Sequence, residues 1–442
     1  MKNSLFEVLD KENLNRLKIS YDYRTDKIVV YAAKEWENDH DFSRYNKDFS
    51  EPDILTSDLV VYNDKQSREI FKKNGSEEYL NKVINLIREG KHQFIDCYYN
   101  KKKNIRFENH AHSDILGRNN RSQAVRAGGI RRHSPQEDEI DVIIDGLNLG
   151  RGMSFKNFAA RIPFGGSKIT VIMDPIDLKD LEAVGFLAYC LDRSRCFTGP
   201  DMNFPTELAD VMKEHFSINI TGGPKGPLGE TGVPTAYGVF LAVKEAAKFR
   251  WGSDDLKGKK AAVSGLGAVG YYLAEHFIKE GAELFVSDIN KDAVARLIDN
   301  HPKAEITYIE PEDIIYQEVD ILSPCAVGGI FHDENIGKLK AQIIIGGANN
   351  QLKASGRDEE VRLANLVKER GILFQEAWWH NGGGVLCGHE EYMMQDNAKM
   401  ENVLRETEKT CKFTYQNLEE AHRLGISPTE NCYRQVEKFI YA

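Results

Sequence analysis

The sequence predicts an α/β protein of two domains, one of which contains a doubly wound parallel sheet. Three observations favour this fold class. The chain has 442 residues, which is more than one hydrophobic core usually supports. Short β-rich segments alternate with helical patterns between residues 261 and 374. A glycine-rich turn separates the first of these strands from the helix that follows it.

The amino-terminal part, residues 1–120, is polar and contains few periodic segments. Lys27–Tyr31 and Leu59–Tyr62 read as short strands. Apolar residues at helical spacing predict a helix over Glu77–Glu89. Farther along, Asp141–Arg151 has a helical pattern, and Ile169–Met173 is a strand that ends at a proline.

Between these last two elements, Gly165-Gly166 is expected to form a loop that approaches a ligand, although a tight turn would use the same residues. Leu178–Leu191 and Pro205–His215 are expected helices, and Thr221–Val233, rich in glycine and proline, is an expected interdomain loop. The elements predicted after this loop are Thr235–Phe249, Ala261–Ser264, Tyr271–Glu280, Glu283–Ser287, Lys291–Asn300, Val319–Leu322, Ile343–Ile345 and Ile372–Phe374.

The composition limits the class of function. A net charge of -10 argues against nucleic acid or an anionic membrane as the main partner, whereas a small-molecule enzyme and an acidic binding protein both fit. No apolar segment is long enough for a signal peptide or a membrane span, so a cytoplasmic protein is expected. The seven cysteines form no C-x-x-C pair, which favours reduced, buried thiols.

A dinucleotide-binding motif follows the strand at residues 261–264. Gly265-Leu266-Gly267-Ala268-Val269-Gly270 has the spacing in which glycines allow a tight turn, close approach to a pyrophosphate and helix packing. Asp288 ends the next strand, where a carboxylate binds ribose hydroxyls and repels the 2′-phosphate of NADP. NAD is therefore the expected cofactor, and a tight turn in a nonbinding domain is the alternative.

Three polar residues precede this motif in glycine-rich or turn-like settings: Lys156, Lys168 and Asp201. Most lysines are solvated surface residues. Lys168 differs because it directly precedes an apolar strand, where partial desolvation would lower the pKa of its ammonium group.

With these residues the sequence resembles the glutamate/leucine/phenylalanine/valine dehydrogenase family, from about Ala127 to Glu390. The sequences of Ser287–Lys291 and Pro324-Cys325-Ala326 are more similar to those of the branched-chain and aromatic members than to that of glutamate dehydrogenase. The segments that carry the resemblance are Ala127–Arg131, Arg151–Asn157, Phe164–Lys168, Asp174-Pro175, Gly199–Asp201, Thr235–Val239, Ser287–Lys291, Asp320–Ala326, Gly347–Leu352 and Asn381–Val385.

The resemblance implies two domains separated by a cleft. Residues 1–220 would form an α/β substrate-binding and oligomerisation domain, residues 221–415 a Rossmann dinucleotide-binding domain, and residues 416–442 a helix that packs back on the first domain. It also implies a homo-oligomer that interconverts an L-amino acid with a 2-oxo acid and ammonia, using NAD and no metal.

The resemblance implies roles for individual residues. Lys156 would hold the substrate α-carboxylate, Asp201 would take the amine proton, and Lys168 would activate water. Backbone at Gly128 and Gly129 would face the substrate. The residues expected to contact the cofactor are Thr235, Gly265, Gly267, Ala268, Val269, Gly270, Asp288, Ala326, Asn350 and Asn381.

Some positions depart from the family pattern. Ser167 replaces a usual glycine, so an altered turn is expected there. Ala127 and Gly388 stand where members that act on glutamate carry a lysine and a serine, so no partner for a γ-carboxylate is expected. Gly388 favours a roomy pocket for an aliphatic or aromatic side chain, unless Trp378, Trp379 or His389 fills it. The family pattern does not account for residues 1–91, which would add to the substrate domain or to a subunit interface.

Three alternatives stay open. Arg126 and Arg131 keep an acidic substrate, and hence a glutamate-type dehydrogenase, possible. A catalytically impaired regulatory homologue that only binds NAD would keep the same fold. His110-Ala111-His112-Ser113-Asp114 places three metal-ligand types at alternate positions of one segment, although a polar strand or loop edge is the favoured interpretation.

Overall fold

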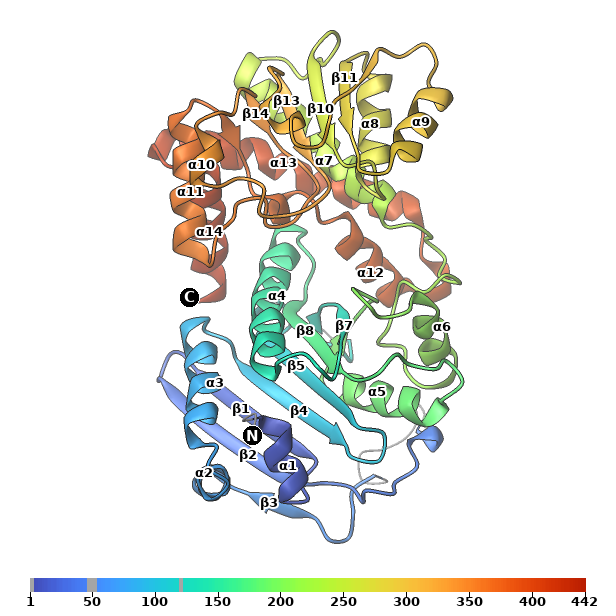
Figure 1. Ribbon diagram of the computed structural model, residues 1–442, viewed down its shortest axis with the longest axis vertical. Helices are drawn as coiled ribbons and strands as arrows, with labels where there is room; N and C mark the ends of the chain where they lie inside the picture. Colours follow the sequence, from blue (N-terminus) through green and yellow to red (C-terminus); the bar gives the residue numbers. More distant parts are fainter. Residues whose placement is uncertain (1–3, 46–53, 119–121) are drawn as a thin grey trace. The chain divides into compact units, whose positions relative to one another are not determined.

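The computed structural model describes residues 4–45, 54–118 and 122–442, which form two compact units (Figure 1). The first unit comprises the described residues up to 158, residues 163–229 and residues 391–397. The second unit comprises residues 159–162, 230–390 and 398–442. The change of unit after Gly229 lies close to the domain boundary that was expected at residue 220.

The first unit is built on one mixed sheet. Within the described residues its strand order is β3-β2-β1-β4-β5-β8-β6-β9, and β7 also pairs with β8. The strands are β1 (Arg16–Asp22), β2 (Lys27–Lys34), β3 (Val60–Tyr62), β4 (Phe94–Asn100), β5 (Ile105–Ser113), β6 (Arg126–Ala127), β7 (Ile130–His133), β8 (Gly165–Ile172) and β9 (Cys196–Phe197).

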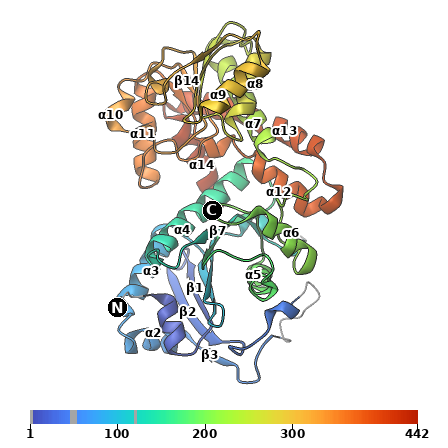
Figure 2. The same ribbon diagram turned by 45° about the vertical axis from the view of Figure 1, so that its right-hand side comes forward.

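Helices cover both faces of this sheet (Figure 2). One hydrophobic core joins α1, α3 and the first half of α4 to β1 and β4, and another joins α5 and α6 to the opposite face of β4, β5 and β8. The helices are α1 (Leu5–Lys11), α2 (Asp64–Lys73), α3 (Glu77–Glu89), α4 (Glu139–Ala159), α5 (Leu181–Arg193) and α6 (Thr206–His215), with short 3-10 turns at Phe42–Arg44 and Ile115–Gly117.

The amino-terminal residues are an integral part of this sheet. Strand β1 lies between β2 and β4. The guanidinium of Arg16 donates to both oxygens of Asp96 at 3.1 Å and to Glu35 Oε1 at 2.8 Å. Burying these charges is tolerable because each has a partner of opposite sign. Of the two roles expected for residues 1–91, an addition to the first domain is therefore observed.

One local expectation in this unit was confirmed in part, and one was wrong. The helix expected over Asp141–Arg151 is present and extends from Glu139 to Ala159, and Gly146 and Gly150 let it lie against His110 of β5. Gly165-Gly166 does not form a loop but begins strand β8. A Cβ at Gly165 would lie 2.0 Å from Ser113 O, so these glycines serve close backbone packing.

The second unit contains a six-stranded parallel sheet of order β12-β11-β10-β13-β14-β15. Renumbered from β10, this is the order 3-2-1-4-5-6 of the dinucleotide-binding Rossmann fold, which confirms the predicted fold class. The strands are β10 (Lys260–Ser264), β11 (Glu283–Ser287), β12 (Ile306–Tyr308), β13 (Ile321–Pro324), β14 (Ile343–Ile344) and β15 (Leu373–Phe374).

Eight α-helices accompany this part of the chain: α7 (Gly232–Trp251), α8 (Gly270–Lys279), α9 (Lys291–Asn300), α10 (Asp333–Ile336), α11 (Arg357–Glu369), α12 (Gly383–Met394), α13 (Met400–Leu424) and α14 (Pro428–Ile440). Short 3-10 turns cover Ile314–Tyr316 and Ala377–Trp379, and a third, Gln395–Asn397, lies in the segment that belongs to the first unit.

The carboxy-terminal helices differ from expectation. Residues 416–442 were expected to pack on the first domain, but they belong to the second unit. Buried Asn417 donates to Gln375 Oε1 at 3.0 Å, and Arg357 on α11 donates to Glu437 on α14 at 2.7 Å. These polar contacts fix α13 and α14 beside β15 and α11.

Candidate active site

Lys168 and Asp201 are bonded to each other in the first unit. Lys168 lies within β8 and is 5% exposed, and its Nζ contacts Asp201 Oδ2. The segment that carries Asp201 runs beside β7, because Ile130 N donates to Gly199 O and Asp201 N donates to Ile130 O, both at 2.9 Å. Two residues separated by 33 positions in the sequence thus meet at neighbouring strands.

The glycine pair next to β7 leaves room for the lysine. A Cβ at Gly129 would lie 2.8 Å from Lys168 Nζ, and a Cβ at Gly128 would lie 2.0 Å from Ser167 O. Neither position tolerates a side chain without displacing its neighbour. The backbone of this pair therefore borders the ammonium group of Lys168.

Burial and charge shift the pKa of both members of the pair. Desolvation lowers the pKa of Lys168, although the Asp201 carboxylate opposes this effect. Burial would raise the pKa of Asp201, but the charges of Lys168 and then Arg131 outweigh it and lower that pKa. The lowered pKa expected for Lys168 from its sequence context is consistent with this environment. The ionised form of Asp201 is therefore favoured, and Lys168 gives up its proton more readily than a solvated lysine does.

Lys156 does not lie in a turn. It is a half-buried residue in the last turn of α4. The next residue, Asn157, is fully buried and donates to Gly165 O at 2.7 Å, which fixes the end of α4 against the start of β8. Ser167 likewise lies in β8 rather than in an altered turn, and its hydroxyl bonds to Asn109 Oδ1.

Both arginines that kept an acidic substrate possible have partners within the first unit. Arg126 is buried, donates to Ser194 O at 2.7 Å and lies 4.9 Å from the ring centre of Phe94. Arg131 donates to Asp201 Oδ2 at 3.1 Å and to Asp145 Oδ2 at 2.8 Å. The role of Arg131 beside Asp201 was missed, although its position two residues after Gly129 places both on one face of an extended segment.

The histidines of β5 make structural hydrogen bonds. His110 Nε2 lies 2.8 Å from Thr170 Oγ1 and 3.1 Å from Glu108 Oε2, and His112 Nδ1 lies 2.8 Å from Ser154 Oγ. Within the described part of the chain, no three histidine, cysteine, aspartate or glutamate residues are arranged to hold a metal ion.

The glycine-rich turn of the second unit has the shape that a pyrophosphate needs. Gly265 has a φ of +98°, and its Cβ would lie 2.7 Å from the Cβ of Ala326. A Cβ on Gly270 would lie 1.8 Å from Gly265 O, whereas a Cβ on Gly267 would meet no atom within 4 Å. The turn is therefore closed on its inner side and open at Gly267, three residues before α8 begins without a side-chain cap.

Asp288 lies at the end of β11 and is hydrogen-bonded to this turn. Its Oδ2 accepts from Leu266 N at 2.6 Å, and its Oδ1 accepts from Asn290 N at 2.7 Å. The carboxylate thus lies directly beside the glycine turn. This is the position in which it would meet the adenosine ribose of a dinucleotide.

The other expected cofactor contacts lie on separate segments of the second unit. Asn381 donates to Gly347 O at 3.1 Å and to Asn349 Oδ1 at 2.8 Å. Asn350 is exposed with a φ of +50°. Thr235 donates to Thr231 O at 2.8 Å near the start of α7. Gly388 is half-buried in α12, and Trp378 and Trp379 are buried.

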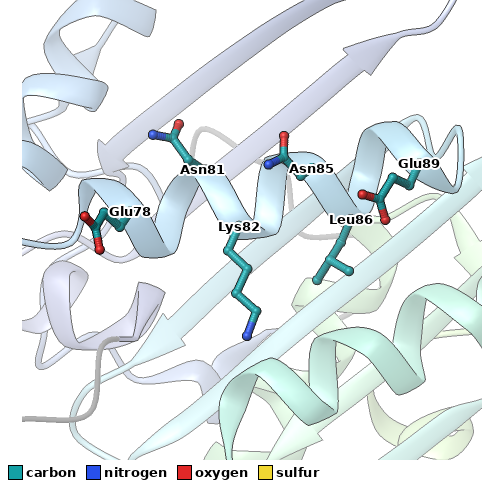
Figure 3. A pocket seen from close by; sticks show the side chains of 6 residues that line it. All are labelled: Glu78, Asn81, Lys82, Asn85, Leu86 and Glu89. Carbon is teal, nitrogen blue, oxygen red and sulfur yellow. The ribbon is translucent and has the colours of Figure 1, made fainter.

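Two further observations complete the description. A shallow depression on α3 is lined by side chains of that single helix and contains none of the expected site residues (Figure 3).

Among the described residues, no helix is both long and apolar enough to cross a membrane.

Two family models together match most of the chain. One, described as the dimerisation domain of Glu/Leu/Phe/Val dehydrogenases, matches residues 117–219, and the other, described as Glutamate/Leucine/Phenylalanine/Valine dehydrogenase, matches residues 226–290 and 285–433. The chain belongs to the glutamate/leucine/phenylalanine/valine dehydrogenase family. As a member of this family it is an oxidoreductase that acts on amino acids.

Relatives in this family support the leucine/phenylalanine/valine branch. The phenylalanine dehydrogenase of Lysinibacillus sphaericus is 35% identical over 321 residues, covering 71% of this chain and 81% of the relative. The leucine dehydrogenase of Bacillus subtilis is 38% identical over 305 residues, covering 68% and 79%.

Solved structures of the family agree with the fold. The L-tryptophan dehydrogenase from Nostoc punctiforme has 28% identity and a TM-score of 0.68, covering 81% of this chain and 98% of that chain. A hetero-hexameric glutamate dehydrogenase from Thermus thermophilus, at 20% identity and a TM-score of 0.56, covers 76% and 84% and shares the fold.

Proposed function

We propose that the protein is an NAD-dependent dehydrogenase that converts an aliphatic or aromatic L-amino acid into its 2-oxo acid and ammonia, or catalyses the reverse reductive amination. The observation that carries the proposal is the pair of buried Lys168 and half-buried Asp201 beside the backbone of Gly129. A carboxylate that is ionised and a lysine with a lowered pKa are the base and the water-activating group that the reaction needs.

Three residues, Lys156, Asp201 and Lys168, are proposed to carry out substrate binding and the first proton transfer. The ammonium of Lys156 would hold the α-carboxylate of the amino acid. Asp201 would accept a proton from the substrate's α-ammonium group, because only a neutral amine can release hydride from its α-carbon. The low pKa of Asp201 makes it a weak base. When Lys168 releases its proton to solvent, the cation that lowers this pKa is gone, which eases proton transfer to Asp201 and leaves Lys168 neutral.

NAD, when bound, supplies the acceptor for the hydride that leaves the α-carbon. Water then attacks the carbon of the resulting iminium group while neutral Lys168 takes a proton from that water. Asp201 returns its proton to the nitrogen, the carbon–nitrogen bond breaks, and the carboxylate takes the hydroxyl proton as the carbonyl forms. The sum is amino acid, water and NAD giving 2-oxo acid, ammonia, NADH and protons.

The choice of NAD rests on the glycine turn and Asp288. The open position at Gly267 gives backbone access to the pyrophosphate, and the carboxylate of Asp288 would accept from the ribose hydroxyls. A 2′-phosphate at the same place would be repelled. Thr235, Ala326, Asn350 and Asn381 remain proposed contacts to the rest of the cofactor.

The cations of the first unit support the proposed substrate class. A γ-carboxylate needs a cation, yet Arg126 is held by Ser194 O and Arg131 by two aspartates. Ala127 and Gly388 offer no charge. A nonpolar side chain is therefore favoured, with Gly388 leaving space for it.

A homo-oligomer is also proposed, because residues 117–219 match a model described as a dimerisation domain. Light scattering on the purified protein tests this, and a mass equal to one chain contradicts it.

Initial rates of NADH formation across aliphatic, aromatic and acidic amino acids test the proposal, with NADP as the alternative cofactor. We expect the highest kcat/KM with an aliphatic or aromatic amino acid and NAD. Turnover with none of them would favour an NAD-binding regulatory protein, and a preference for glutamate would favour the glutamate-type enzyme.

A further inference from the structure

Arg131 links Asp201 to a second carboxylate, that of Asp145 on α4. Its Nε donates to Asp201 Oδ2 at 3.1 Å, and its Nη1 donates to Asp145 at 2.8 and 3.1 Å. The Arg131 side chain is only 15% exposed, and both carboxylates are about one-third exposed. Contacts in such a half-buried setting are screened less than those on an open surface.

Both cations bind the same carboxylate oxygen of Asp201. Lys168 and Arg131 both bind Oδ2, so neither cation uses Oδ1. The side chain of Asp201 is thereby fixed from two directions, by a cation on β8 and a cation on β7. The carboxylate also accepts a hydrogen bond from the backbone N–H of Met202, so a substrate amine would be one further donor to it.

The network continues toward solvent. His133 lies two residues beyond Arg131 in β7, with Nε2 3.5 Å from Asp145 Oδ2 and Nδ1 2.7 Å from Glu137 Oε2. The charged and titratable groups that surround Asp201 are therefore Lys168 on β8, Arg131 and His133 on β7, Asp145 on α4, and Glu137 before α4.

We propose that Arg131 and Asp145 are positioning residues of opposite charge that hold Asp201 in place and set the pH at which the pair of Lys168 and Asp201 works. This inference rests on the proposed roles of Lys168 and Asp201. The positive charge of Arg131 favours the ionised form of Asp201 and the neutral form of Lys168. The negative charge of Asp145 favours the charged form of Lys168 and partly cancels Arg131.

The two charges predict opposite displacements of the pH–rate profile. Arg131→Gln removes a positive charge, which should move the profile of kcat/KM to higher pH. Asp145→Asn removes a negative charge, which should move it to lower pH. We expect each shift to be about half a pH unit or more. We also expect a lower kcat in Arg131→Gln, because Asp201 loses one of the two cations that bind its carboxylate. Arg131→Lys should keep the profile near that of the unmodified protein.

Matched controls separate charge from folding. Arg132→Gln removes the same charge from the next residue of β7, but Arg132 bonds to the carbonyls of Asn203 and Met173 and not to Asp201. Asp141→Asn removes a negative charge from an exposed side chain in the first turn of α4. Neither control should move the profile, and thermal melting establishes that each variant is folded.

The outcomes distinguish this inference from the proposed function. If the unmodified enzyme turns over no amino acid, the proposed function fails before any variant is tested. If it is active, the pH–rate profile of Asp145→Asn tests the inference, because Asp145 is not among the expected substrate contacts. An acid shift supports the inference, and an unchanged profile or an alkaline shift overturns it.

Discussion

The carboxylate of Asp288 accepts a hydrogen bond from the backbone N–H of Leu266, with 2.6 Å between nitrogen and Oδ2. The residue proposed to select NAD therefore also holds the glycine turn in its closed form. Selection and turn geometry are coupled through one side chain. A substitution that removes the whole carboxylate changes both at once.

Asp288→Ala and Asp288→Asn separate these two effects. The asparagine keeps an oxygen for Leu266 N but loses the charge, whereas the alanine loses both. We expect both variants to lower the ratio of kcat/KM for NAD over NADP by at least about tenfold, equivalent to ~1.4 kcal/mol. The alanine should also raise KM for both nucleotides. An unchanged ratio in both variants would assign the selection to another residue.

Lys168→Ala and Asp201→Asn test the proposed proton chemistry. Each should lower kcat by about a hundredfold or more, the usual loss when a positioned acid or base is removed. NADH binding, measured by its fluorescence, should stay as in the unmodified protein, because the proposed nucleotide contacts lie in other residues. Near-normal kcat in either variant would show that the assigned role is wrong.

A substitution at Gly152 in α4 is expected to raise stability and to weaken substrate binding. A Cβ at this position would meet no atom within 4 Å, yet glycine inside a helix costs about 1 kcal/mol relative to alanine. Lys156 lies one turn after Gly152 on the same face of α4, so a methyl group at Gly152 would narrow the open space through which a substrate carboxylate would reach Lys156. Gly152→Ala should raise the melting temperature and also raise KM for the amino acid.

Gly146→Ala is the matched control for Gly152→Ala. Its new Cβ would lie 2.2 Å from the ring of His110, so this substitution should destabilise the same helix. An unchanged KM in Gly152→Ala would mean that the open space beside Lys156 has no part in binding.

Glu139 predicts a pH-dependent stability. It accepts from Leu5 N at 2.6 Å and from Tyr79 OH at 3.0 Å, which joins α4 to α1 and α3. Burial, and then the carboxylate of Glu108, raise its pKa from 4.5 to about 7. Folding then takes up a proton between these two values. The free energy of unfolding should therefore fall as pH rises through this window, by at most ~3 kcal/mol from this group.

Glu139→Gln removes this titration while keeping an acceptor oxygen. Chemical unfolding of both proteins near pH 5 and near pH 8 measures the effect. The unmodified protein should lose stability relative to the variant as pH rises. A difference between the two proteins that is the same at both pH values would contradict a raised pKa at Glu139.

Elements with strong local signals could be predicted from the sequence. The helices at Glu77–Glu89 and Lys291–Asn300 have the predicted bounds, because their apolar periodicity coincides with their packed faces. The turn at Gly265 and the strand that ends before Asp288 were also recognised, since the glycines of the turn are required by local backbone geometry. The family resemblance was confirmed by matches over most of the chain.

Features that depend on distant partners were not predicted. The start of β8 reads as a glycine-rich turn because Gly165 packs against Ser113 of β5 and Gly166 against Ser154 of α4, contacts that local propensity does not contain. The link from Arg131 to Asp145 joins a strand to a helix one element later, and no spacing rule points to it. The place of residues 416–442 depends on buried amides such as Asn417, whose partner Gln375 lies far away in the sequence.

The position of β5 limits how this enzyme can be divided. Residues 117–219, which match the family's dimerisation model, include β8 but not its neighbour β5. A chimaera joined at residue 117 would turn the strand that carries Lys168 into an exposed edge and would separate Arg16 and Asp96 from the rest of their sheet. Exchange of modules with related dehydrogenases is better designed with a junction near Gly229, where the first unit keeps every strand of its sheet.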